Sequence, residues 1–154
     1  MSERLMNGPS PLSRGERELI LAYAAGVAGC RFVCVAHSEV AYALGIERGT
    51  IEHLLDDPQN TVVEPRLNSL IAYVRKLMTA PSAMSQADAD AVVKAGWDER
   101  ALHDAIAITA RAAFMQRLVE GHGFVTMSQE LAAKRARQRV ERGYINLYPV
   151  FREK

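Results

Sequence analysis

The segment LSRGERELILAYAAGVAGCRFVCVAHSEVAYALGI, Leu12 to Ile46, carries the strongest fold signal in the chain. Ser13 and Glu16 form an S-x-x-E capping box, which is typical of the first turn of a helix. Apolar residues then recur at helical spacing and predict one buried face, made of Leu19, Ile20, Tyr23, Ala24 and Val27. A second helix is expected over residues 30–44, with Gly45 as its C-terminal stop. The segment therefore predicts two consecutive helices.

Helical patterns continue along the rest of the chain, over about residues 50–55, 65–78, 85–95, 99–120 and 128–142. Ser85 and Asp98 are expected to cap the starts of two of these helices. The longest one should turn seven residues inward, namely Leu102, Ala105, Ile106, Ile108, Ala112, Met115 and Leu118. No stretch alternates apolar and polar residues over any length, so strands are not expected. The sequence predicts an all-α fold.

The chain of 154 residues is expected to form one domain, residues 1–154. Asn-Gly-Pro and Ser-Pro breakers predict a flexible N-terminal arm over residues 1–11. The core should span residues 12–124, and residues 125–154 should add a C-terminal helix and tail.

The composition excludes several function classes. The formal net charge is +1 and 24% of the residues are charged, so no global electrostatic field favours nucleic acid or a membrane surface. No apolar run approaches the roughly 20 residues that cross a bilayer, and the N-terminus lacks the apolar core of a signal peptide. We therefore expect a cytoplasmic protein whose thiols are mostly reduced.

Cys30, Cys34 and His37 form the one chemically suggestive cluster. On a helix at about 100° per residue they lie within roughly 60° of one another and share a face. Cys30 lies near a helix N-terminus, where the helix dipole can lower a thiol pKa and so favour the nucleophilic thiolate. His37 is close enough along the helix to accept a proton from either sulfur.

A structural interpretation of the same residues stays open. Free cysteines are among the most buried residues, and a single histidine on an apolar face is more often structural. A metal site is disfavoured because only three ligands are present where zinc usually takes four. No metal and no cofactor are predicted.

Three passages resemble the carboxymuconolactone decarboxylase and alkylhydroperoxidase D (AhpD-like) family, especially its peroxidase-related branch. The first, within the segment quoted above, is similar to the family's E-x11-C-x-x-C-x-x-x-H pattern. The second, LIAYVRKLMTAPSAMSQADADAVVKAGWDERALHDAIAI, resembles the helices that follow it. The third, AAFMQRLVEGHGF, is similar to the F-x-x-M-x-R-L-x-x-G run of the peroxidase-related branch. The resemblance implies an AhpD-like helical bundle.

The resemblance assigns roles residue by residue. Glu18 matches the relay glutamate, Cys30 the resolving cysteine and His37 the relay histidine. The peroxide-reacting cysteine should stand three residues after the first, where this chain has Val33. Cys34 stands one residue further along the chain, so its sulfur points in a direction about 100° away from that of position 33. The shift also stretches the pair, since Cα atoms about 6 Å apart are near the upper limit for an unstrained disulfide.

In the mechanism that the resemblance implies, glutamate and histidine deprotonate a thiol that reduces a hydroperoxide and becomes a sulfenic acid. The second thiol condenses with it to a disulfide, and a dithiol reductant restores both. Homo-oligomers, as dimers, trimers or hexamers, are also implied. The apolar surface of such an assembly is expected to include Phe114, Met115, Leu118, Phe124 and the tail INLYPVF, residues 145–151.

Three functions remain open. The first is an AhpD-like thiol peroxidase, an antioxidant enzyme that uses Glu18, Cys30, Cys34 and His37. The second is a non-redox enzyme of the decarboxylase type that acts on a lactone, with His37 and Glu18 as acid and base and the cysteines as packing. The third is a family member that has lost catalysis.

Two further features bear on the function. His103 is either a polar residue on a helix face or a second group in the same cavity. The basic tract KRARQRVERG, residues 134–143, lacks aromatic partners and a nucleic-acid motif, and is interpreted as a solvated or subunit-bridging helix face.

Overall fold

The computed structural model describes residues 2–58 and 62–146. Within these residues the chain is helical and contains no strand. The elements are α1 (Ser2–Asn7), α2 (Arg14–Val27), α3 (Arg31–Ala43), α4 (Thr50–Asp56), α5 (Pro65–Thr79), the 3-10 helix η1 (Pro81–Ala83), α6 (Gln86–Lys94), α7 (Glu99–Gly121) and α8 (Gln129–Arg142). The all-α fold predicted from the sequence is confirmed.

Side-chain caps begin several of these helices where the sequence predicts them. The Glu16 amide donates to Ser13 Oγ at 3.1 Å, and the Glu16 carboxylate accepts from the Ser13 amide at 2.6 Å. Asp98 begins α7 in a similar way, because its Oδ1 accepts from the Ala101 amide at 2.8 Å. Such caps satisfy backbone donors that have no partner inside the helix, and so fix where each helix starts.

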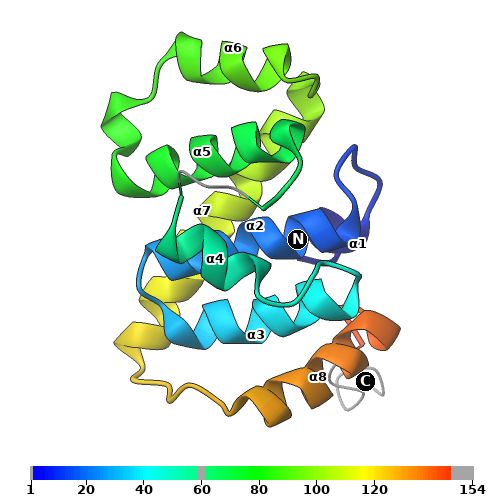
Figure 1. Cartoon of the computed structure of the whole chain (residues 1–154). Coiled ribbons are helices and arrows are strands. Elements are labelled where there is room, and N and C mark those ends of the chain that lie inside the picture. The colour runs from blue at the N-terminus through cyan, green and yellow to red at the C-terminus, as the bar shows by residue number, and fades with distance from the viewer. Residues whose placement is uncertain (1, 59–61, 147–154) are drawn as a thin grey trace.

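Helix α2 is the centre of the fold. It packs against α1, α3, α4, α5 and α7, and it is buried along most of its length, as expected for a helix with neighbours on every side. Figure 1 shows α3 lying between α2 and α8, while α5 and α6 form the opposite end of the molecule. The first helix pair of the sequence therefore supplies both the core and the scaffold for the candidate site.

The N-terminal residues are not the flexible arm that the sequence predicts for residues 1–11. Residues 2–7 form α1, and Met6 is fully buried. Arg17, itself buried, donates to the backbone oxygens of Leu5 at 3.0 Å and Gly8 at 2.8 Å. The breakers after α1 end a short helix and let the chain turn, while Met6 and Arg17 hold that helix on α2.

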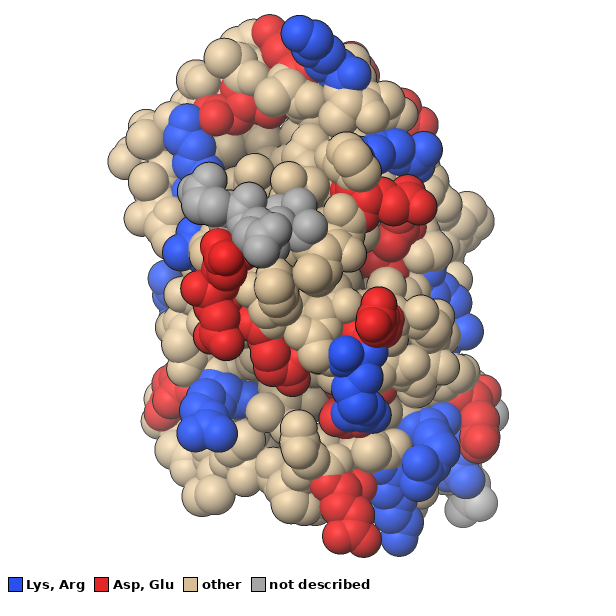
Figure 2. Space-filling view, in the orientation of Figure 1, with Lys and Arg blue, Asp and Glu red and all other residues tan. Residues whose placement is uncertain are grey.

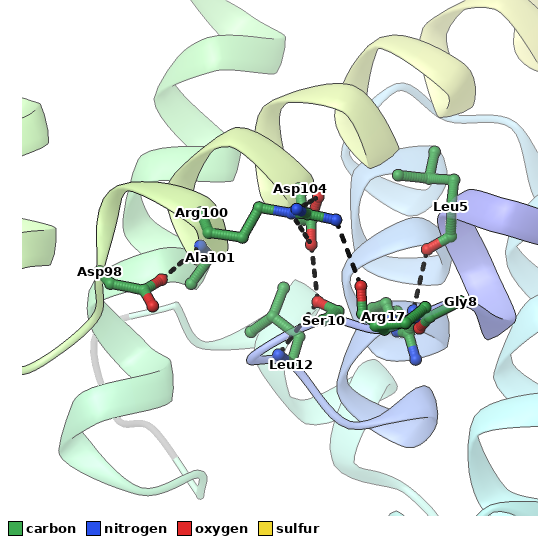
Figure 3. A network of polar contacts seen from close by, with 10 residues as sticks. Leu5, Gly8, Ser10, Leu12, Arg17, Asp98, Arg100, Ala101 and Asp104 are labelled. Carbon is green, nitrogen blue, oxygen red and sulfur yellow. Dashed lines mark hydrogen bonds and ion pairs between the residues drawn. The ribbon is translucent and has the colours of Figure 1, made fainter.

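A second set of contacts ties the following residues to α7 (Figure 3). Ser10 Oγ donates to Asp104 at 2.7 Å, and Arg100 donates to Asp104 at 3.2 Å and to the Pro9 oxygen at 3.2 Å. Asp104 is buried, so these donors compensate a carboxylate that would otherwise be costly to remove from water. Residues 2–10, which precede α2, are thus held on α2 by Arg17 and on α7 by Arg100 and Asp104.

The inward face of α7 differs in part from the prediction. Ala105, Ile108 and Ala112 are buried as expected, but Leu118 is 40% exposed. Val119 takes the inward position instead, where it packs beside Cys30. Phe114 is 62% exposed, so the C-terminal half of α7 presents apolar side chains outward.

The surface around α8 is basic on its outer side. Lys134, Arg135, Arg137 and Arg142 are exposed, whereas Arg139 is only partly exposed and turns toward the interior. Figure 2 shows Lys and Arg side chains gathered with acidic ones at the lower right, over α8. Across the described ranges no helix has the length and apolar character needed to cross a bilayer.

Candidate functional site

The candidate site lies where α2, α3 and the residues after α8 meet. Glu18 is on α2 and His37 on α3, and the turn between these helices depends on Gly29. Gly29 has a φ of 74°, a left-handed conformation that glycine adopts without the steric cost of a Cβ. This turn brings the two helices side by side, so residues 19 positions apart become neighbours.

Glu18 and His37 form a buried hydrogen-bonded pair. His37 Nδ1 lies 2.6 Å from Glu18 Oε2, and the two residues are only 5% and 2% exposed. A carboxylate can only accept, so the ring donates through Nδ1–H and Nε2 keeps its lone pair. Within the described part of the chain no hydrogen bond reaches Nε2. The arrangement leaves one imidazole nitrogen for chemistry.

Tyr144 completes this pair from the segment that follows α8. Its hydroxyl donates to the second carboxylate oxygen, Glu18 Oε1, at 2.5 Å. Its ring lies nearly parallel to the His37 ring, with 12° between the planes and 6.4 Å between the centroids. Sequence reasoning missed Tyr144, because no pattern links a residue after the last helix to position 18.

Burial and charge act against each other in this pair. Burial alone would raise the pKa of the Glu18 carboxyl, but His37, Tyr144 and Arg139 together hold that pKa below its usual value. Burial lowers the pKa of His37, and the nearby Arg111 and Arg139 add to this effect while Glu18 opposes it. Burial and the Glu18 carboxylate also raise the pKa of Tyr144. At neutral pH the site therefore holds a carboxylate, a neutral imidazole and a neutral phenol.

A cavity of about 560 Å³ borders this pair and is lined by both His37 and Tyr144. Much of its wall is apolar and comes from α3, α7 and α8 and the loop between the last two, with side chains that include Phe32, Val33, Met115, Val119, Phe124 and Met127. This volume suits a small organic molecule rather than a polymer.

The two cysteines do not line that cavity. Cys30 precedes α3 and is fully buried beside Ala25, Val33 and Val119. Cys34 lies on α3, three residues before His37, but lines a second cavity of about 640 Å³, and its sulfur is 3.9 Å from Ser38 Oγ. Both thiols are free. Of the four residues proposed from the sequence, the structure therefore pairs Glu18 with His37, while neither Cys30 nor Cys34 lines the cavity of His37.

Neither thiol is activated by its surroundings. Burial raises the pKa of Cys30, and the Glu120 carboxylate adds to this, against the opposing effect of backbone N–H groups at the start of α3. Burial likewise raises the pKa of Cys34, which outweighs its contact with Ser38. The lowered Cys30 pKa that the helix N-terminus suggests is thus not found, because burial dominates the dipole.

His103 lies away from the candidate site. It lines a third cavity, of about 940 Å³, with Arg4, Arg100, Asp104 and Phe114. Residues 2–58 and 62–146 contain no group of three His, Cys, Asp or Glu side chains placed to hold a metal ion.

Two solved structures share this fold. An uncharacterized peroxidase-related protein from Silicibacter sp. TM1040 aligns with a TM-score of 0.76 and 21% identity, over 82% of this chain and 66% of that one. The alkylhydroperoxidase AhpD core of an uncharacterized peroxidase-related protein from Ralstonia eutropha JMP134 aligns with a TM-score of 0.72 and 22% identity, over 77% and 63%. The chain thus spans slightly less than two thirds of either protein. No protein-family model matches the chain, and no curated protein matches it either.

These alignments establish the class of fold. The chain has the AhpD-like helical fold, as its sequence predicts. The similarity noted from its motifs is thereby supported as a likeness of fold to peroxidase-related and AhpD proteins.

Proposed function

We propose that this chain is a non-redox enzyme with an AhpD-like fold, in which His37 is the general base for a small molecule bound in the 560 Å³ cavity. One observation carries the proposal: the cavity is lined by His37, held by Glu18, and by Val33 where the thiol peroxidases of the resembling family carry their reactive cysteine. Proton transfer requires His37 and Glu18 but no thiol.

The proposed chemistry follows from the state of the pair. Neutral His37 accepts a proton from the substrate at Nε2 and becomes an imidazolium. Glu18 keeps the ring in one tautomer and stabilises the positive charge that forms on it, as the carboxylate does in a Ser-His-Asp triad. His37 returns the proton later in the reaction, to a different atom of the substrate, so the cycle needs no external reductant.

Tyr144 is a positioning residue in this proposal. Its hydroxyl occupies the Glu18 oxygen that His37 does not use, so the carboxylate cannot rotate away from the ring without losing a charge-assisted hydrogen bond. A rigid carboxylate keeps Nε2 in one orientation, which is the condition for efficient proton transfer.

A thiol peroxidase is the second candidate, and one observation favours it. Cys34 is partly exposed and lines a cavity of its own, with Arg31 and Ser38 on the same wall. A hydroperoxide bound there would be attacked by the Cys34 thiolate, which would become a sulfenic acid as the peroxide O–O bond breaks and the alcohol leaves. The raised thiol pKa makes this reaction slow.

The base activity can be tested without knowing the substrate. 5-Nitrobenzisoxazole is a small aromatic probe that opens to a coloured phenolate when a base removes its carbon-bound proton. We expect wild-type protein to accelerate this opening, His37→Ala to abolish the acceleration and Cys34→Ala to leave it unchanged. A wild-type rate no greater than that of His37→Ala would refute the proposed base.

The peroxidase candidate is tested in parallel. Dimedone labels sulfenic acid, so mass spectrometry after a brief peroxide pulse reports whether Cys34 or Cys30 is oxidised. Our primary proposal expects no adduct and no hydroperoxide consumption with dithiothreitol. A Cys34 adduct together with consumption lost in Cys34→Ala would establish the second candidate instead.

We also propose a homo-oligomeric, cytoplasmic protein. The exposed Phe114 and Leu118, one turn apart on α7, and the exposed Phe124 support self-association, because exposed apolar side chains favour burial against a partner. Residues 147–151 of the apolar tail lie outside the described residues. Two free cysteines and no disulfide are consistent with a reducing compartment.

A further inference from the structure

Two buried arginine atoms in the described residues have no hydrogen-bond partner, Arg111 Nη1 and Arg139 Nε. Buried polar atoms are nearly always paired, because an unpaired one loses its hydration and gains nothing in return. The cost is greater for a charged donor such as a guanidinium. Two such donors in one region therefore require an explanation.

Both atoms belong to one place in the fold. Arg111 is on α7 and Arg139 is on α8, yet both line the cavity that His37 borders. Their guanidinium carbons lie 5.3 Å and 5.1 Å from the centroid of the Tyr144 ring. The two cations therefore converge on the same aromatic ring, in a cavity that also has apolar side chains from α3 and α7 in its wall.

Nearby acceptors do not satisfy these donors. The buried Glu18 carboxylate already accepts from His37 and from Tyr144, through one oxygen each. Ser2 Oγ accepts from Arg111 Nε at 3.1 Å and leaves Nη1 free. Among the described residues no acceptor pairs with either atom, and because both side chains line the cavity, a carboxylate bound there would lie beside two guanidinium groups.

We propose that Arg111 and Arg139 bind the carboxylate of a small organic acid whose apolar remainder fills the cavity beside His37. This inference rests on the proposed function and adds the substrate class to it. A planar guanidinium donates through geometry that matches a carboxylate. Phe32, Val33 and Met115 line the same space and suit a hydrocarbon or aromatic body.

The placement explains how such a ligand would be oriented. The carboxylate is held at the arginine end, so the rest of the molecule extends along the apolar wall past the imidazole. The atom that gives up its proton must therefore be a short distance from the carboxylate in the ligand. Arg135 lines the same cavity from the exposed side of α8 and adds positive charge at its mouth.

Calorimetry with phenylacetate, its neutral amide phenylacetamide and inorganic phosphate tests the inference. We expect phenylacetate to bind and the amide to bind at least about tenfold more weakly, since it lacks the charge. Arg139→Gln and Arg111→Gln should each weaken phenylacetate binding by about tenfold or more. Arg137→Gln, an exposed arginine on the same helix, is the matched control and should bind as the wild type does.

Several outcomes would overturn the inference. They are equal binding of acid and amide, no binding of phenylacetate, an equal loss in the Arg137→Gln control, and phosphate binding as tightly as phenylacetate. If Arg139→Gln fails to fold, Arg139→Lys keeps the charge but not Nε–H, and a loss of affinity there supports the same contact.

The variant His37→Ala separates this inference from the proposed function. It should still bind phenylacetate, because the arginines do not act through His37. Binding retained in His37→Ala, with no base activity in the wild type, would refute the proposed base and leave the carboxylate site standing. Base activity in the wild type without phenylacetate binding would support the proposed base and refute the carboxylate site.

Discussion

Val33 and Cys34 are neighbours in the sequence, but they line different cavities. Val33 shares its cavity with His37, and Cys34 shares the other with Ser38. Successive residues on a helix point about 100° apart, so moving a thiol by one position moves it to another wall of α3. The single-residue shift therefore places the Cys34 thiol in a different cavity from His37.

Moving the thiol back should create peroxidase activity. In the double variant Val33→Cys with Cys34→Val, a sulfur enters the cavity of His37, where the imidazole can accept its proton. We expect hydroperoxide consumption with a dithiol reductant to rise above that of the wild type. The single variant Cys34→Val is the control. A fast wild type with no gain in the double variant would contradict this reading of the site.

The native thiols should react slowly with iodoacetamide. Both have a pKa raised above the ordinary 9.0, chiefly by burial, so little thiolate is present at neutral pH. Cys34 should be modified before Cys30, because only Cys34 is partly exposed. Timed mass spectrometry, with urea-unfolded protein as the reference, measures both rates. Modification of Cys30 first, or at the unfolded rate, would disagree with the structure.

Tyr144→Phe should destabilise the protein by about 1.5–3 kcal/mol, since it removes a hydrogen bond to a buried carboxylate. Tyr42→Phe is the matched control. Tyr42 also donates to a glutamate, Glu52, but at an exposed site, so its loss should cost no more than about 0.5 kcal/mol. Urea unfolding measures the two free energies. Similar losses in both variants would mean that burial does not strengthen the hydrogen bond from Tyr144 to Glu18.

Stability should fall as the pH drops below about 6.5. His37 has a lowered pKa in the folded state, so the unfolded chain takes up a proton near 6.5 while the folded protein does not. The free energy of unfolding then decreases by up to about 1.4 kcal/mol per pH unit until the folded pKa is reached. Glu18 acts in the same direction below its ordinary value of 4.5, because its folded pKa is also lowered.

His37→Gln isolates the histidine in this pH dependence. Its free energy of unfolding should change less steeply than that of the wild type between pH 6.5 and 4.5. Equal slopes would show that His37 titrates normally in the folded protein.

Light scattering should give a mass above that of one chain at micromolar concentration. The pair Phe114→Ser and Phe124→Ser should lower this mass, because both side chains are more than half exposed in the single chain and would be covered in an assembly. The exposed pair Val62→Ser and Val93→Ser serves as the control. A monomer for the wild type would argue against self-association.

The helices were predictable because their signals are local. The Ser13–Glu16 box and the Asp98 cap lie within four residues of the turns that they begin, so a short window of sequence contains the whole cause. These caps are fixed by short-range chemistry, which a single sequence displays. The pairing of Glu18 with His37 was expected only from the resemblance to the AhpD-like family, since the two residues are 19 positions apart.

Features that depend on distant contacts were missed. Helix α1 is stabilised by the burial of Met6 and by Arg17, and neither can be inferred from the breakers around it. Tyr144 reaches Glu18 across 126 positions. The raised pKa of Cys30 depends on burial by α7, which the helix-dipole argument does not include. Each missed feature requires the tertiary arrangement.

The contacts of Tyr144 have a consequence for synthesis. Its amide donates to Glu3, 141 positions earlier, while its hydroxyl holds Glu18. On the ribosome, a nascent chain that has emerged only through α7 already carries Glu18, Cys30 and His37 but lacks α8 and Tyr144, which form one side of the cavity. The pocket can close only after residue 144 leaves the exit tunnel, so during translation the base stays exposed to water, and it becomes enclosed in one of the last steps of folding.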